Sequence, residues 1–122
     1  MDVLVVEKDA SELSYLVELI KQLGHSVDQS ETGRGALERV TERMFDLVIL
    51  DIPILDIATQ DLIAGFKELY PEIGIVTMTE SNSTDLEKEI RSMGIIYYMV
   101  KPIEGNVLKD ILDHISKRIT TK

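Results

Sequence analysis

Four short apolar runs in this chain each end in a side chain that could take part in phosphate chemistry. The four are Glu7 after Val3–Val6, Asp51 after Leu47–Leu50, Thr79 after Ile73–Met78, and Lys101 with Pro102 after Ile96–Val100. If the runs are parallel strands, their carboxyl ends meet at one edge of a sheet, where open α/β folds place their chemistry. Two carboxylates, a hydroxyl and an amine would converge there. That set could accept a phosphoryl group on a carboxylate and sense that the group is there.

The elements that must position these side chains alternate along the chain as strand–helix units. A weaker fifth strand is expected at His25–Gln29. The expected helices run from the capping box Asp9-x-x-Glu12 to Gly24, over Thr32–Arg43, over about 59–70, from a second capping box at Thr84 to Gly94, and through the apolar positions between Leu108 and Ile119. This alternation predicts one α/β domain, residues 1–122, with a five-stranded parallel sheet and helices on both faces.

Composition narrows the classes of partner. The 122 residues carry 13 basic and 22 acidic side chains, for a net charge of −9. Such a surface repels nucleic acid and anionic membrane, so neither is expected to bind this domain directly. The chain has no cysteine, which excludes disulfides and thiolate metal sites and fits a cytoplasmic protein. No apolar run approaches the ~20 residues of a membrane span.

The whole chain resembles a response-regulator receiver domain of two-component signalling. Asp51 follows the sequence Phe-Asp-Leu-Val-Ile-Leu, as the phospho-accepting aspartate of receivers does. Thr79 matches the switch hydroxyl, Tyr98 the switch aromatic, Lys101-Pro102 the receiver lysine and its proline, and Glu7 the first member of the acidic pair. The resemblance implies the flavodoxin-like strand order 2-1-3-4-5, with the switch point between the strands that end in Glu7 and Asp51.

The resemblance also implies a cofactor and partners. Receivers bind Mg²⁺ through the acceptor carboxylate, an acidic residue after the first strand and a backbone carbonyl, which correspond here to Asp51, Glu7 and Pro53. The expected partners are a histidine kinase or phosphotransfer protein and a downstream output domain or protein. No enzymatic activity is expected beyond self-phosphorylation from a phosphodonor. The Lys101–Pro102 peptide bond is expected to be cis.

One pocket position departs from the family pattern. Lys8 stands where receivers carry the second acidic residue, so Glu7 and Asp51 would face Lys8 and Lys101 with a formal charge of about zero. Two unit charges ~4 Å apart interact by about 4 kcal/mol at an effective dielectric constant of about 20, which would weaken Mg²⁺ binding. We therefore expect Lys8 to pair with Asp51 or Glu7 in the metal's place. Asp9 could compensate in part, but a helix cap is the favoured interpretation.

The loops near Asp51 depart as well. Leu55 and Thr59 stand where receivers usually carry proline and glycine, and Glu80 replaces a small residue and would narrow access to Asp51.

Two functions remain open on the sequence alone. Intact Asp51, Thr79 and Lys101 favour a receiver that is phosphorylated to switch protein–protein interactions. Lys8, Glu80 and the altered loop favour a pseudo-receiver, which keeps the fold as an interaction module. In either case we expect partners, or a second copy in a homodimer, to dock on the face built by the fourth helix, the fifth strand with Tyr97 and Tyr98, and the last helix.

Overall fold

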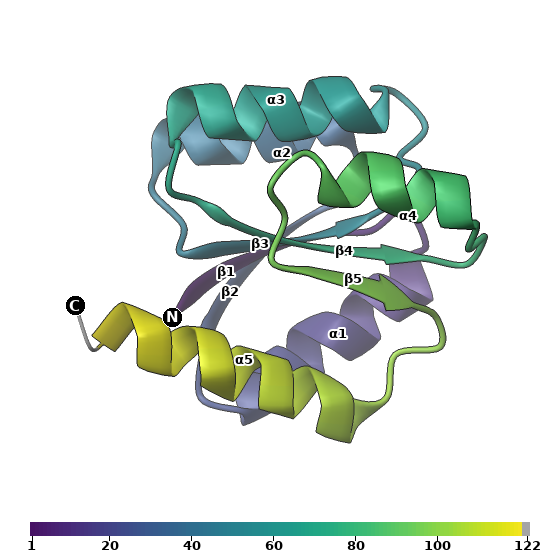
Figure 1. Ribbon diagram of the computed structural model, residues 1–122. Coiled ribbons are helices and arrows are strands. Elements are labelled where there is room, and N and C mark those ends of the chain that lie inside the picture. The colour runs from purple at the N-terminus through teal and green to yellow at the C-terminus, as the bar shows by residue number, and fades with distance from the viewer. Residues whose placement is uncertain (121–122) are drawn as a thin grey trace.

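The computed structural model describes residues 1–120, which are built around one parallel five-stranded sheet (Figure 1). The strand order is β2-β1-β3-β4-β5, as the resemblance implied. The strands are β1 Asp2–Val6, β2 Ser26–Ser30, β3 Leu47–Asp51, β4 Gly74–Thr79 and β5 Tyr97–Val100. β3 and β4 are buried along their whole length, which explains why they appear in the sequence as nearly continuous apolar runs.

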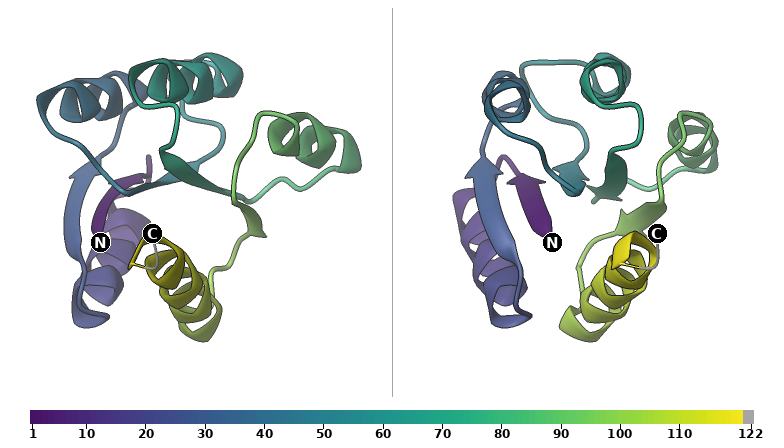
Figure 2. Two further views of the ribbon diagram at one scale, coloured as in Figure 1. Left: turned by 60° about the vertical axis from the view of Figure 1, so that its left-hand side comes forward. Right: turned by 90° about the vertical axis from the view of Figure 1, so that its left-hand side faces the viewer.

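Helices cover both faces of the sheet. They are α1 Ala10–Gln22, α2 Gly33–Glu42, α3 Thr59–Leu69, α4 Thr84–Arg91 and α5 Gly105–Thr120. In Figures 1 and 2, α1 and α5 lie on one face, whereas α2, α3 and α4 lie on the other. The core accordingly consists of two apolar clusters, one on each side, to which alternate residues of the central strands contribute. Each helix of residues 1–120 is too short or too polar to span a lipid bilayer.

The strand register brings the predicted site residues to one edge. β1 and β3 are neighbours, with Val6 opposite Leu50, so Glu7 and Asp51 leave adjacent strands side by side. On the other side of β3, Asp51 is opposite Met78 of β4. Thr79 is in turn opposite Val100, the residue before Lys101. The parallel order therefore gathers at the carboxyl edge residues that are far apart in the chain.

Most predicted boundaries are confirmed to within a few residues, but the capping boxes need correction. Asp9 caps α1, because its carboxylate accepts hydrogen bonds from the backbone of Ser11 and Glu12. The Glu12 side chain, however, reaches away from the cap. The N-cap of α4 is Ser83 rather than Thr84, since the Ser83 hydroxyl accepts from the backbone N–H of Leu86. Sequence spacing could not distinguish two adjacent hydroxyl residues.

Candidate functional site

Three predicted site residues lie buried at the carboxyl edge of the sheet. Glu7, Asp51 and Thr79 are 0% exposed, and the Lys101 side chain is 8% exposed. The Lys101 ammonium lies 3.1 Å from Glu7 Oε1 and 3.0 Å from Asp51 Oδ1. A buried charge needs a counter-charge and a buried polar group needs a hydrogen-bond partner, and Lys101 meets these needs for Asp51 and Glu7 respectively.

Glu12 belongs to the same cluster, which the sequence did not predict. Its Oε2 atom lies 2.7 Å from the Lys101 ammonium, the shortest of that ammonium's carboxylate contacts. Glu12 comes from the first turn of α1. Its position after Asp9 matched a capping box, and that local pattern concealed a partner 89 residues further along the chain. The signal that could have found it is a carboxylate in the first turn of the helix that follows β1, at the edge of the sheet where Lys101 was predicted.

Lys8 pairs with Asp51, as expected. Its ammonium donates to Asp51 Oδ2 at 2.6 Å and to the Pro53 carbonyl oxygen at 3.1 Å. The Lys8 side chain remains 30% exposed, whereas the Asp51 side chain is 1% exposed, so Lys8 covers the carboxylate on its outer side. Asp51 is thus held between two ammonium groups, one at each carboxylate oxygen.

Burial and pairing shift the pKa values of the cluster in opposite directions. Burial raises the pKa of Glu7 to about 8, with hydrogen bonding to Glu12 and Asp51 adding to the effect. Burial also acts to raise the pKa of Asp51, but hydrogen bonds with Glu7, Lys8 and Lys101 outweigh it and lower that pKa. At neutral pH Glu7 is therefore mostly protonated. The negative charges of Asp51 and Glu12 then balance the positive charges of Lys8 and Lys101.

The oxygens that the resemblance assigns to Mg²⁺ do not fit the ion in this arrangement. Two of them, Asp51 Oδ2 and the Pro53 carbonyl, already accept hydrogen bonds from Lys8. Both oxygens of the third residue, Glu7, accept from Lys101. Within residues 1–120, no three carboxylate or histidine side chains are grouped so as to hold a metal. A hard dication that demands octahedral oxygen ligands would have to displace an ammonium first.

Thr79 and Tyr98, the two residues predicted to act as a switch, lie next to this cluster rather than within it. The buried Thr79 hydroxyl accepts a hydrogen bond of 3.1 Å from the backbone N–H of Ser81. Tyr98 packs on the α4 side of the sheet with the Arg91 guanidinium 5.8 Å from its ring centre. Tyr97, on the opposite face of β5, makes an edge contact with His114 of α5. The two tyrosines therefore face different layers and cannot form one aromatic patch.

The loops around the site differ from the sequence expectations in one respect. The Lys101–Pro102 peptide bond is cis, as expected, and the Ile52–Pro53 bond is also cis, which was not predicted. Glu80 is 68% exposed, and its Oε1 atom lies 3.8 Å from the Lys101 ammonium. Its carboxylate thus stands at the outer side of the cluster, where it adds negative charge near the approach to Asp51.

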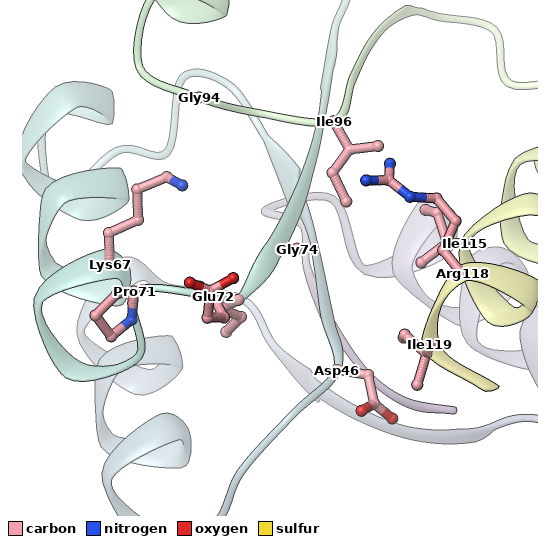
Figure 3. A pocket seen from close by; sticks show the side chains of 11 residues that line it. Asp46, Lys67, Pro71, Glu72, Gly74, Gly94, Ile96, Ile115, Arg118 and Ile119 are labelled. Carbon is pink, nitrogen blue, oxygen red and sulfur yellow. The ribbon is translucent and has the colours of Figure 1, made fainter. Parts of the chain in front are cut away.

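Two hollows lie at opposite edges of the sheet. One of about 280 Å³ adjoins the cluster and is lined by Glu12, Tyr15, Leu16, Met78, Lys101, Pro102 and Ile103. The other, of about 260 Å³, is at the amino ends of the strands, where Lys67 and Glu72 face Ile96, Arg118 and Asp46 (Figure 3). The second hollow is remote from Asp51, and its mixed charges favour no single class of ligand.

Comparison with known proteins places the whole fold in one family. A model of the response regulator receiver domain matches residues 3–113. Transcriptional regulatory protein ZraR of Escherichia coli O157:H7 is 33% identical over 113 residues, which are 93% of this chain and 26% of ZraR. Luminescence regulatory protein LuxO of Vibrio campbellii is 28% identical over 116 residues, 95% of this chain and 26% of LuxO. This chain therefore spans about a quarter of the length of these relatives.

Solved structures agree on the fold. A two-component response regulator from Clostridium difficile superimposes with a TM-score of 0.92 at 21% identity and covers 98% of both chains. That likeness extends over every strand and helix described above. Because the family model and the more similar relatives cover nearly the same residues, this chain belongs to the response regulator receiver domain family.

Proposed function

We propose that Asp51 is the phosphoryl acceptor of this receiver domain and that its phosphorylation switches protein–protein interactions. The observation that carries the proposal is the setting of Asp51. It is a buried carboxylate at the switch point of the sheet, held between two ammonium groups. Two cations at one carboxylate can neutralise an incoming phosphoryl group, and charge repulsion is the main obstacle to such a transfer.

The neighbouring residues have distinct roles in this proposal. An oxygen of Asp51 forms the new bond to phosphorus, while the bond between phosphorus and the donor breaks and the donor leaves with its electron pair. Lys101 is within 3.0 Å of Asp51 Oδ1 and would contact the phosphoryl oxygens. Thr79 would exchange its bond from Ser81 for one to the phosphate, and Tyr98 would respond beside α4.

Receiver domains generally bind Mg²⁺ at the phosphorylation site. In this chain the corresponding oxygens of Glu7, Asp51 and Pro53 already accept hydrogen bonds from Lys101 or Lys8, so we expect weak Mg²⁺ binding at most.

The partners in this proposal are those of a signalling domain. A histidine kinase or phosphotransfer protein would supply the phosphoryl group, and an output domain or protein would receive the signal. The face of α4, β5 and α5 would carry that contact or a homodimer, with Tyr98 at its α4 side. Tyr98→Ala should then alter self-association or partner binding, measured by sedimentation and pull-down, without unfolding the domain. A cytoplasmic location and the absence of direct contact with nucleic acid or membrane remain predictions.

The test of the acceptor is phosphoryl transfer itself. The protein is incubated with acetyl phosphate or phosphoramidate, or with a phosphorylated histidine kinase, in the presence of Mg²⁺, and its intact mass is measured. We expect one added phosphoryl group in the wild type and none in Asp51→Asn. A wild type that accepts no phosphoryl group from any of these donors would identify a pseudo-receiver instead, an alternative that neither the family match nor the relatives favour.

A further inference from the structure

We propose that the Lys8 ammonium is the resident cation of the acidic site, so that Asp51 accepts a phosphoryl group without a divalent metal. The inference rests on the proposed function, because it concerns the same carboxylate. It goes beyond that function by replacing a soluble cofactor with a side chain of the protein.

The first support is where the ammonium lies. Lys8 Nζ bridges Asp51 Oδ2 and the Pro53 carbonyl oxygen, at 2.6 and 3.1 Å. These oxygens come from the end of β3 and from the loop that follows it, whereas Lys8 follows β1. A single group therefore connects the two loops at the switch point of the sheet, a connection that a metal ion would otherwise have to make.

The second support is the distribution of charge on Asp51. Lys8 holds Oδ2, while Oδ1 faces Lys101 at 3.0 Å. Oδ1 is buried and, among the described residues, has no hydrogen bond in an aligned geometry. Of the two Asp51 oxygens, Oδ1 is thus the one with fewer hydrogen bonds to give up when it bonds to phosphorus. Lys8 therefore adds one positive charge at Asp51 beside the charge of Lys101, which receivers carry in any case.

The third support is the mobility that the geometry allows. Lys8 is on the outer side of Asp51 with 30% of its side chain exposed, and lysine is a long, flexible side chain with three donors. It can keep a hydrogen bond to Oδ2 while it turns toward solvent to admit a donor. Lys101, at 8% exposure and within ion-pair distance of four carboxylates, has no comparable freedom.

The proposed step balances with acetyl phosphate as donor. Asp51 Oδ1 forms a bond to phosphorus as the bond between phosphorus and the acetyl oxygen breaks. Acetate leaves as an anion with the electron pair of that bond, so no proton is required. Lys8 stays on Oδ2 and Lys101 follows the phosphoryl oxygens, and together they offset the charge of the new phosphoryl group.

The first test measures metal binding without any transfer chemistry. Mg²⁺ is titrated into the ¹⁵N-labelled protein, and the amide shifts of Asp51, Ile52 and Ile54 are followed by NMR. The wild type and Lys8→Arg should bind at least tenfold more weakly than Lys8→Met. Lys21→Met is the matched control, since it removes the same charge from an exposed lysine at the far end of α1 and should resemble the wild type. Equal affinity in wild type and Lys8→Met would overturn the assignment of Lys8.

The second test measures acceptance of the phosphoryl group. Labelling by acetyl phosphate is followed by intact mass in excess EDTA and in Mg²⁺. The proposal expects the wild-type rates to agree within about twofold, and Lys8→Met to lose most of its labelling in EDTA. Labelling of the wild type only with Mg²⁺ would overturn the inference and leave the proposed function intact. No labelling in either condition, or with a phosphorylated kinase, would overturn the proposed function; a gain of labelling in Lys8→Met would show that Lys8 blocks the site.

Discussion

The acidic site and the hydroxyl groups of Thr77 and Tyr98 belong to the same sheet, but their buried polar atoms are partnered differently. Every carboxylate around Lys101 lies within ion-pair distance of an ammonium. Thr77 and Tyr98 are opposite each other on β4 and β5, and among the described residues neither hydroxyl has a hydrogen-bond partner. A buried polar group without a partner costs about 1–3 kcal/mol.

The difference indicates which part is fixed and which can rearrange. The acidic site is assembled with its charges compensated, so its geometry is set before any ligand arrives. The hydroxyl pair carries an unfavourable free energy that a different side-chain arrangement could relieve. A chemical change at Asp51 thus begins in an ordered site. It can lead to a rearrangement around Thr77 and Tyr98, where this conformation carries an unfavourable free energy.

The strongest test of this contrast removes the charge at the centre of the acidic site. Lys101→Met leaves Glu7, Glu12 and Asp51 without their shared ammonium and should lower the free energy of unfolding by about 3–5 kcal/mol. The measurement is urea unfolding at neutral pH. Lys109→Met removes an exposed lysine that forms a surface ion pair with exposed Asp113 and should change little. Equal losses in the two variants would mean that the acidic site is no more ordered than the surface.

The second test uses pH. Because the pKa of Glu7 is about 8 in the folded state against 4.5 as its reference, the folded state binds more protons between these values. The free energy of unfolding should therefore fall as pH rises from about 5 to 8, by at most about 1.4 kcal/mol per unit.

Glu7→Gln should remove this fall, because glutamine does not titrate. His25 contributes the opposite slope below its reference of 6.5, since burial lowers its pKa, and the comparison of the two proteins cancels that contribution. Parallel pH profiles of stability for wild type and Glu7→Gln would refute a protonated Glu7.

The third test compares the two lysines of the site. Lys8→Met should lower the free energy of unfolding by about 1 kcal/mol, because its ion pair is partly exposed and therefore weakened by solvent. The loss should be several times smaller than that of Lys101→Met in the same urea experiment. A larger loss in Lys8→Met than in Lys101→Met would show that Lys8, and not Lys101, contributes more to the stability of the fold.

The smallest expected effect is in the hydroxyl pair. Tyr98→Phe and Thr77→Val delete buried hydroxyls without hydrogen-bond partners, so each should be neutral or raise the free energy of unfolding by up to about 1 kcal/mol. Thermal unfolding with a matched wild type is sufficient. A loss above about 1 kcal/mol in either variant would show that its hydroxyl has a partner, for example an ordered water molecule, and would remove the contrast with the acidic site.

The fold could be predicted almost completely because apolar runs and helical spacing mark nearly every strand and helix in the sequence. Apolar or nearly apolar runs predicted β1, β3 and β4, and helical spacing predicted the covering helices. The second strand was displaced by one residue, from His25–Gln29 to Ser26–Ser30, because it lies at the edge of the sheet and is only partly buried. Val27 is its only apolar residue, so the sequence gives the strand no sharp boundary.

The site residues that follow strands could be predicted from the sequence. The site residue that comes from a helix, Glu12, could not. The pairing of Lys8 with Asp51 follows from two neighbouring strand ends and one missing carboxylate. Glu12 was missed because its local pattern already had an explanation as a cap. The raised pKa of Glu7 depends on depth of burial and on Glu12 together, and neither can be obtained from residue spacing.

The separation of 94 residues between Lys101 and Glu7 has a consequence for the cooperativity of unfolding. Lys101 follows β5, an edge strand, which would ordinarily be among the first elements to open locally. If β5 detached and carried Lys101 away, Asp51 would be left with Lys8, and Glu7 and Glu12 would lose the ammonium group that they contact. The outermost strand is thereby coupled to the first strand of the chain, and hydrogen exchange in β5 should approach the protection of the central strands.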